Sequence, residues 1–178
     1  MHSSEIEMNQ VNIQYYKTKY AEFIIGSYNG KLCMLDFRYR KMRKTVDNRI
    51  KKTLNAEFIE KDDELLKETR KQLNEYFDMK RREFDIPILM LGTEFQKSVW
   101  KALLKITYGK TASYLELSKI IGKEKAVRAV ANANGANSIG IIIPCHRIIG
   151  SNGELTGYAG GLALKKRLLE LENNLFTV

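Results

Sequence analysis

The first third of the chain alternates apolar and polar residues in the way that half-buried strands do. Three such stretches, residues 11–16, 21–30 and 31–39, are rich in β-branched and aromatic side chains. Asn29-Gly30 lies at the end of the second stretch, and this dipeptide is typical of a tight β-hairpin turn. The pattern predicts a small sheet at the start of the chain.

A helical periodicity follows over residues 62–77, where Leu66, Leu73 and Phe77 fall close to one face. This spacing predicts an amphipathic helix packed on the sheet. The basic segment before it, residues 38–52, is typical of a solvated loop or a strand edge. We assign that segment no functional role.

The pattern changes near Pro87, because proline cannot continue a helix and short helical stretches follow it. We place the domain boundary within residues 85–92. This boundary separates a strand-rich structural unit, residues 1–88, from a helical unit, residues 89–178.

Three short helices are predicted in the second unit, over residues 93–106, 113–122 and 125–134. Two of them begin with the spacing of a capping box, namely Thr93 with Gln96 and Ser113 with Glu116. The apolar face of the first helix comprises Phe95, Val99, Trp100, Leu103 and Leu104. Such an arrangement is typical of a helix-turn-helix, whose last helix usually contacts nucleic acid.

The third of these helices carries mostly small side chains, and Arg128 is its only long cation after the first residue. Small residues allow a backbone to approach a ligand closely, but they equally allow two helices to pack together. Both interpretations stay open on this pattern alone. Residues 139–143 form a continuous apolar run, which predicts a buried strand leading directly into Pro144 and Cys145.

The net charge is +9 and the pI is about 9.5, which favours a polyanionic partner. Most of the excess positive charge lies after residue 92, so the second unit is the expected nucleic-acid face. No apolar run reaches the roughly 18 residues of a membrane span, and the first ten residues lack a signal-peptide pattern. We therefore expect a cytoplasmic protein with no membrane partner.

The chain has only two cysteines and two histidines, so a four-ligand zinc site would need all of them. We expect no metal. Cys33 lies in a strand-like apolar run and is interpreted as a core residue. Cys145 and His146 are adjacent, and a thiol with an ordinary pKa of about 8.5 needs a base or a positive environment to act as a nucleophile.

Neighbouring side chains on an extended strand point to opposite faces, so Cys145 and His146 can cooperate only if the chain turns there. Pro144 favours such a turn. The alternative is a buried cysteine beside an unrelated histidine.

Several separated motifs carry a resemblance to a known family. They are Tyr108-Gly109-Lys110-Thr111, the helix start at Tyr114, Arg128-Ala129-Val130, Asn137, Pro144-Cys145-His146-Arg147 and Gly157-Tyr158-Ala159-Gly160-Gly161. In this order, from Thr93 to about Glu172, the chain resembles the O6-alkylguanine-DNA alkyltransferases. The resemblance implies an α/β (α+β) fold, in which a small N-terminal β-sheet domain with a helix precedes a helical domain with a winged helix-turn-helix-like core.

The resemblance further implies irreversible, stoichiometric alkyl transfer from O6-alkylguanine in double-stranded DNA to Cys145, with O4-alkylthymine as a second candidate substrate. No cofactor is implied, and a monomer suffices for a single-turnover protein. His146 would take the thiol proton and Glu172 would orient His146. Tyr114 would donate to the guanine ring, and Asn137 would support the turn before the active-site strand.

The family also implies a base flipped out of the duplex into a pocket. Arg128 would fill the vacated stack, with Ala129, Ser113 and Thr111 as further DNA contacts. The expected pocket residues are Tyr158, Ala159, Gly160, Ile148 and Pro144. Ala159 replaces a serine found in some relatives, so the backbone must supply that contact. At position 148 this chain has isoleucine, which is larger than the valine found in some relatives.

Three competing functions remain to be weighed. A non-catalytic lesion recogniser would lack the cysteine, which this chain has. A methylation-sensing transcription factor would carry an additional cysteine-rich metal domain. A hydrolase or redox enzyme with a Cys-His pair would leave Arg128, Asn137 and the glycine-rich loop unexplained.

Overall fold

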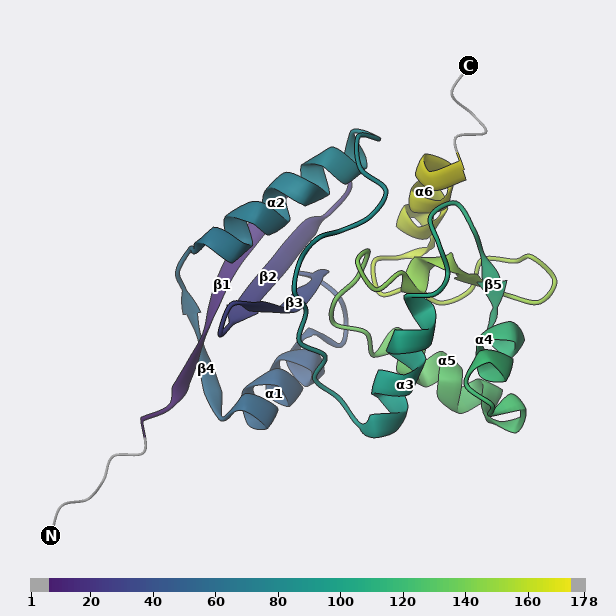
Figure 1. The fold of residues 1–178 in the computed structure, drawn as a ribbon, viewed down its shortest axis with the longest axis horizontal. Helices are drawn as coiled ribbons and strands as arrows, with labels where there is room; N and C mark the ends of the chain where they lie inside the picture. Colours follow the sequence, from purple (N-terminus) through teal and green to yellow (C-terminus); the bar gives the residue numbers. More distant parts are fainter. Residues whose placement is uncertain (1–6, 174–178) are drawn as a thin grey trace, which may run out of the picture.

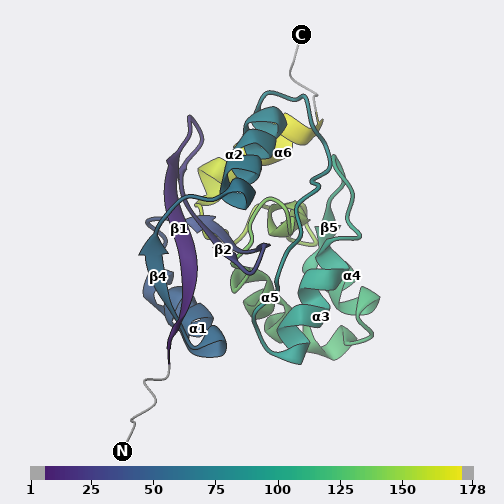
Figure 2. The same cartoon turned by 60° about the vertical axis from the view of Figure 1, so that its left-hand side comes forward.

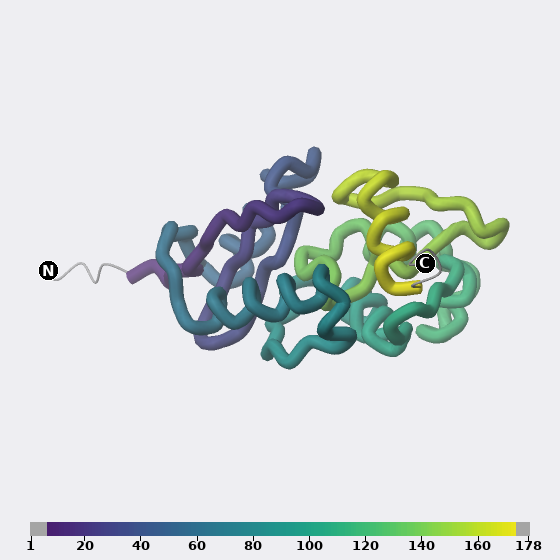
Figure 3. Tube along the Cα trace, turned by 90° about the horizontal axis from the view of Figure 1, so that it is seen from above, coloured from purple at the N-terminus to yellow at the C-terminus, as the bar shows by residue number. Residues whose placement is uncertain are grey.

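The computed structural model describes residues 7–173, which form two units lying side by side (Figure 1, Figure 3). The N-terminal unit is a four-stranded sheet of order β3-β2-β1-β4, in which β4 runs parallel to β1 and the other neighbours are antiparallel. Its strands are β1 Asn9–Lys17, β2 Glu22–Tyr28, β3 Lys31–Phe37 and β4 Ala56–Glu60. The three strands predicted from the sequence are present, whereas β4 was not expected.

The hairpin between β2 and β3 turns at Asn29-Gly30, as predicted. Both residues have positive φ, 49° and 74°, which is the conformation of the two-residue turn that suits twisted strands. Asparagine and glycine are the residues that tolerate this region of backbone space best. The register Tyr28↔Lys31 therefore follows directly from the local sequence.

Two helices cover opposite faces of the sheet, as Figure 2 shows. Helix α2, Glu64–Phe77, confirms the predicted amphipathic helix and is capped by the Asp63 side chain, which accepts from the Leu66 amide. It packs with Phe23 and Ile25 in one apolar cluster, which extends into the second unit. Helix α1, Arg43–Leu54, covers the other face. The alternation of Phe23, Ile24 and Ile25 thus supplies both cores.

The interpretation of residues 38–52 as a solvated loop or strand edge was wrong. Most of this basic segment belongs to α1, whose only buried residues are Val46 and Ile50. An i,i+4 pair is a narrow apolar stripe, and the surrounding cations hide it in a sequence pattern. The helix ends at Asn55, which has φ 46°.

The helical unit is built from short elements with tight connections. They are α3 Glu94–Leu103, β5 Ala112–Ser113, α4 Tyr114–Ile120, a 3₁₀ turn Glu124–Ala126, α5 Val127–Gly135, a 3₁₀ turn Cys145–Arg147, β6 Ile148–Ile149 and α6 Leu162–Asn173. Both predicted capping boxes are present. Trp100 is buried as expected, but Leu104 follows the end of α3 and is 44% exposed, so its assignment to the apolar face was wrong.

The outer edge of β3 joins the two units. Leu32 exchanges backbone hydrogen bonds with the connecting segment, donating to the Pro87 carbonyl and accepting from the Leu89 amide. Farther along the same edge, Leu35 donates to Ser138 and accepts from Gly140. The sheet edge is thereby covered, and it fixes the segment that precedes Cys145. None of the helices in residues 7–173 has both the length and the apolar character needed to span a bilayer.

Candidate active site

The segment that leads to Cys145 is a buried turn and not the predicted strand. Ile139 makes a single bridge to Leu35, after which Ile141 adopts a positive φ of 68° and the chain bonds to itself. The Asn137 side chain supplies hydrogen bonds that a neighbouring strand would otherwise make. Its amide nitrogen donates to the carbonyl of Ile143 at 2.9 Å, and its amide oxygen accepts from the Ile139 amide at 2.9 Å. An apolar run indicates burial, but burial is compatible with either structure.

Cys145 begins a 3₁₀ turn, so the turn that the Pro144-Cys145-His146 sequence requires is present. The thiol is buried, and Asn137 Nδ2 donates to its sulfur at 3.3 Å. Burial raises the pKa of Cys145, and the Asn137 hydrogen bond opposes that shift. The same side chain of Asn137 therefore stabilises the turn and lowers the pKa of the thiol.

The imidazole of His146 is buried and lies against a buried carboxylate. Its Nε2 lies 2.7 Å from Glu172 Oε1, and its Nδ1 has no hydrogen-bond partner within residues 7–173. Burial lowers the pKa of His146, while the hydrogen bond to Glu172 raises it. Within residues 7–173 the structure shows no direct hydrogen bond between Cys145 and His146, so the proton transfer expected between them stays a prediction.

Glu172 is the centre of a buried hydrogen-bond network. Arg147 donates to both of its oxygens, through Nε at 2.9 Å and Nη2 at 2.8 Å. Burial by itself would raise the pKa of Glu172, but the hydrogen bonds from His146 and Arg147 lower it to about 2. The carboxylate is therefore ionised at neutral pH, where it orients the imidazole and stabilises it when it becomes protonated.

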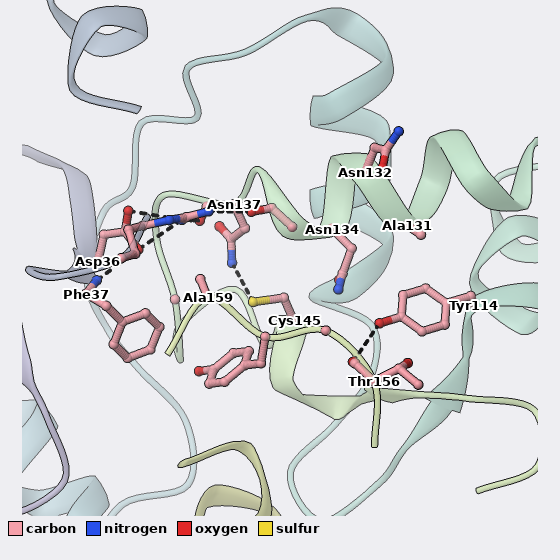
Figure 4. A pocket seen from close by; sticks show the side chains of 15 residues that line it. Asp36, Phe37, Tyr114, Ala131, Asn132, Asn134, Asn137, Cys145, Thr156 and Ala159 are labelled. Atoms are coloured by element: carbon pink, nitrogen blue, oxygen red, sulfur yellow. Dashed lines mark hydrogen bonds and ion pairs between the residues drawn. The ribbon is translucent and has the colours of Figure 1, made fainter. Parts of the chain in front are cut away.

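A cavity of about 360 Å³ opens onto the thiol (Figure 4). Asp36 and Phe37 lie at one end, Tyr114 and Thr156 lie at the other, and Cys145 lies between them. The Tyr114 hydroxyl donates to the Thr156 carbonyl at 3.1 Å. A mostly apolar cavity with a few polar groups is typical of a small-molecule binding site. Here the Cys145 thiol lies in the cavity, where it could accept a small group from a bound molecule.

Comparisons with known proteins agree with this geometry. A family model for the DNA-binding domain of 6-O-methylguanine DNA methyltransferases matches residues 94–174, and a model for the ribonuclease-like domain of the same proteins matches residues 11–90. The chain belongs to the 6-O-methylguanine DNA methyltransferase family. The resemblance inferred from the motifs is thereby confirmed, together with the predicted fold class.

Individual relatives support the assignment over most of the chain. A methylated-DNA–protein-cysteine methyltransferase of Methanosarcina barkeri is 53% identical over 119 residues, which cover 67% of this chain and 75% of the relative. The inducible enzyme of Bacillus subtilis is 44% identical over 122 residues, 68% of each chain. The crystal structure of Mycobacterium tuberculosis OGT in complex with DNA aligns with a TM-score of 0.77 and 36% identity, covering 93% of both chains.

The predicted DNA contacts of this family member lie on an exposed surface. Arg128 and Ala129 are exposed on α5, and Thr111 is exposed just before β5. Ser113 is the N-cap of α4, and its hydroxyl accepts from the Glu116 amide, so its side chain already has a structural partner. The small residues Ala131 and Asn134 of α5 line the cavity instead, which places one face of the helix on the acceptor site.

The predicted pocket residues divide into two groups. Tyr158 and Ala159 line the cavity, whereas Gly160, Ile148 and Pro144 do not. A Cβ on Gly160 would lie 2.9 Å from the Phe37 ring, so this glycine allows the loop to approach the sheet. Ile148 pairs with Ala112 in the two-stranded sheet, and Pro144 faces a second cavity.

Sequence reasoning missed several residues of the site, among them the cavity residues Phe37 and Thr156 and four largely buried side chains that form hydrogen bonds in or beside it. Lys165 is fully buried and donates to the carbonyls of Thr156 and Gly157, which fixes the loop that carries Tyr158. Lys166 and Arg167 follow it directly, and the signal that could have identified Lys165 is its helical spacing with Leu168 and Glu172 on the buried face of α6. The other three come from the N-terminal unit, and they are Asp36, Arg40 and Tyr76.

Replacing Asn137 with alanine is expected to move the ionisation of Cys145 to higher pH. The hydrogen bond to sulfur is lost while burial continues to raise the thiol pKa. A hydrogen bond to a charged group is worth about 1.5–3 kcal/mol, so methyl transfer should slow by at least about tenfold. The pH dependence of Cys145 modification by iodoacetamide measures the shift, and Asn48→Ala on the exposed face of α1 is the control. An unchanged midpoint would limit Asn137 to shaping the turn.

Proposed function

We propose that this protein repairs DNA by direct reversal, moving the alkyl group of O6-alkylguanine in double-stranded DNA onto Cys145. The observation that carries the proposal is the position of the thiol in the cavity, with Asn137 on its sulfur and the His146–Glu172 pair behind it. The reaction is irreversible and occurs once per molecule, since the thiolate of Cys145 is a poor leaving group from the alkyl carbon of the thioether product. It needs no cofactor.

The proposed alkyl transfer begins with deprotonation of the Cys145 thiol. His146 removes the thiol proton through a bridging water, and the resulting thiolate attacks the alkyl carbon opposite O6. A sulfur–carbon bond forms while the carbon–O6 bond breaks, and the electron pair stays on guanine. The Tyr114 hydroxyl exchanges its hydrogen bond to the Thr156 carbonyl for one to the guanine ring and so stabilises this developing anion. The proton taken from sulfur ultimately neutralises the anion.

Recognition of DNA depends on α5 and its surroundings in this proposal. The target oxygen lies inside the duplex, so the base must rotate out into the cavity at a cost that is smaller for a weakly paired lesion. The exposed Arg128 fills the vacated stack, and Ala129 allows the helix to lie close in the minor groove. Thr111 and the Ser113 region contact the neighbouring phosphates.

We further propose that residues 89–178 form the alkyltransferase domain and residues 1–88 a supporting domain. Residues 1–6 of the first range and 174–178 of the second lie outside the residues that the structure describes. A monomer is sufficient because a single DNA footprint and one turnover require no partner subunit. A cytoplasmic location is supported by two free thiols, Cys33 and Cys145, within the described chain.

The decisive experiment is intact-protein mass spectrometry after mixing with a duplex that contains one O6-methylguanine. We expect a gain of one methyl group, located on Cys145 by peptide mapping and never exceeding one per molecule. Cys33 is an internal control, because burial raises its pKa to about 12. Cys145→Ser should gain no mass.

The alternative outcome identifies a different function. If the wild-type mass stays unchanged while the lesion duplex binds more tightly than an unmodified duplex, the protein is a lesion recogniser and the roles assigned above are wrong.

A further inference from the structure

The N-terminal unit places one hydroxyl group against the carboxylate behind the acceptor site. Tyr76 lies near the end of α2 and is fully buried, and its hydroxyl donates to Glu172 Oε1 at 2.8 Å. In Figure 1 the C-terminal end of α2 is directed toward α6, the helix that carries Glu172. These two residues are 96 positions apart in the chain.

The hydroxyl is separable from the packing of the ring. The Tyr76 ring contacts Phe77, Phe84 and Tyr108 at centroid distances of 5.5, 5.5 and 6.2 Å. A phenylalanine would keep all three contacts. A buried tyrosine hydroxyl needs a partner, but packing alone does not require that this partner be the carboxylate bonded to His146.

Three donors share a single oxygen atom of Glu172. Besides Tyr76, Oε1 receives His146 Nε2 at 2.7 Å and Arg147 Nη2 at 2.8 Å. Among the described residues, Oε2 accepts a hydrogen bond only from Arg147 Nε. A carboxylate has about four acceptor positions, so these bonds saturate it. Each additional donor on Oε1 reduces the negative charge available to the imidazole.

Every charged group around His146 contributes to its protonation. Glu172 on α6 favours the protonated ring, whereas Arg147 on the same turn and Lys165 on α6 disfavour it. Tyr108, from the segment after α3, lies beside Arg147 and is neutral at neutral pH, since burial raises its pKa. Tyr76 on α2 is neutral for the same reason. Tyr76 therefore acts only by hydrogen bonding, through the oxygen that His146 uses.

We propose that Tyr76 is a positioning residue, which orients Glu172 and limits how strongly this carboxylate attracts the proton of His146. The inference rests on the proposed alkyl transfer. It assigns the N-terminal unit a part in the reaction, because α2 then adjusts the proton acceptor of a thiol that lies in the other unit.

The test is Tyr76→Phe, with Tyr16→Phe as the matched control. Tyr16 donates to the Asn74 side chain on the same helix but lies partly exposed and does not touch Glu172. Removing the Tyr76 hydroxyl leaves more charge for His146, so its pKa should rise. The acid limb of the rate of methyl transfer should move to higher pH by at least about half a unit, a threefold change in proton affinity. Tyr16→Phe should leave it in place.

A second measurement does not depend on activity. NMR titration of ¹⁵N-histidine-labelled protein reports His146 directly, and His2 is the only other histidine in the sequence. A ring-fluorinated tyrosine at position 76 is a stronger donor and should shift the His146 titration in the opposite direction to Tyr76→Phe. If neither change moves the titration, or both move it the same way, the hydroxyl serves packing only and the proposal fails. Absence of methyl transfer in the wild-type protein would refute the proposed function and leave this titration test intact.

Discussion

Replacing Glu172 with glutamine is expected to slow methyl transfer by about 10- to 100-fold and to lower the free energy of unfolding by about 3 kcal/mol at neutral pH. Glutamine fills the same space but has no charge to offset the buried Arg147 guanidinium or to stabilise protonated His146. Breaking a buried ion pair from one side is costly because the remaining charge stays buried.

The loss of stability should itself depend on pH. The folded-state pKa of Glu172 is about 2, below its ordinary value of 4.5, so the unfolded chain binds the proton more readily. The stabilisation by Glu172 is therefore fully present above pH 4.5 and is lost as the pH falls toward 2, and it amounts to about 3 kcal/mol. The difference between wild type and Glu172→Gln should shrink over this range.

Urea unfolding between pH 3 and pH 7 measures this effect. Glu170→Gln is the control, since Glu170 lies on the same helix with a partly exposed carboxylate 3.9 Å from Lys166. Such a pair contributes at most about 1 kcal/mol. A difference for Glu172→Gln that stays constant with pH would show that the carboxylate does not gain its stability from ionisation.

Local chemistry explains which parts of the fold could be predicted from the sequence. The Asn29-Gly30 turn and the two capping boxes depend on residues at most three positions apart, and all of them are present. Cys145 and His146 could be singled out for a similar reason, because the chain offers only one adjacent pair of these residues. The fold class followed from motifs that stand in order along the C-terminal unit.

Longer-range contacts explain what the sequence concealed. Residues 139–143 are as apolar as a buried strand, yet the Asn137 side chain supplies hydrogen bonds that a neighbouring strand would otherwise provide. Arg40 and Arg49 look like part of a solvated face in the sequence, but in the structure they donate to backbone carbonyls at the end of α5. Tyr76 shows no chemical signal within its own helix, because its partner lies 96 residues away.

Replacing Arg40 with methionine should cost about 3 kcal/mol of stability near neutral pH, since it removes one of the two arginines bound to the buried Asp36 carboxylate and leaves Arg43 at 3.0 Å. Arg40 is bound to the nearly inaccessible Asp36 carboxylate at 3.2 Å, and its side chain is 5% exposed. It also donates to the carbonyls of Gly135 at 2.7 Å and Asn137 at 3.3 Å. A cation at this position satisfies the end of α5, where the helix dipole is negative. The same residue thus holds the C-terminal end of α5 and the turn that carries Asn137.

Arg38→Met provides the control, because the Arg38–Glu22 pair has side-chain exposures of 37% and 25% and should contribute less than about 1 kcal/mol. Burial already raises the pKa of Asp36, and Arg40 and Arg43 oppose that shift, so the pKa should rise further when Arg40 is removed and Arg43 remains. The folded variant then binds this proton more tightly than the unfolded chain does, and its stability should be greater at pH 5 than at pH 8. Urea unfolding at these two pH values measures the change. An equal loss at both would show that Asp36 is not left as an uncompensated charge and that the loss comes from the α5 contacts alone. A smaller loss of stability at pH 5 than at pH 8 would instead show that the Asp36–Arg40 ion pair stabilises the contact between the sheet and the segment that carries Asn137.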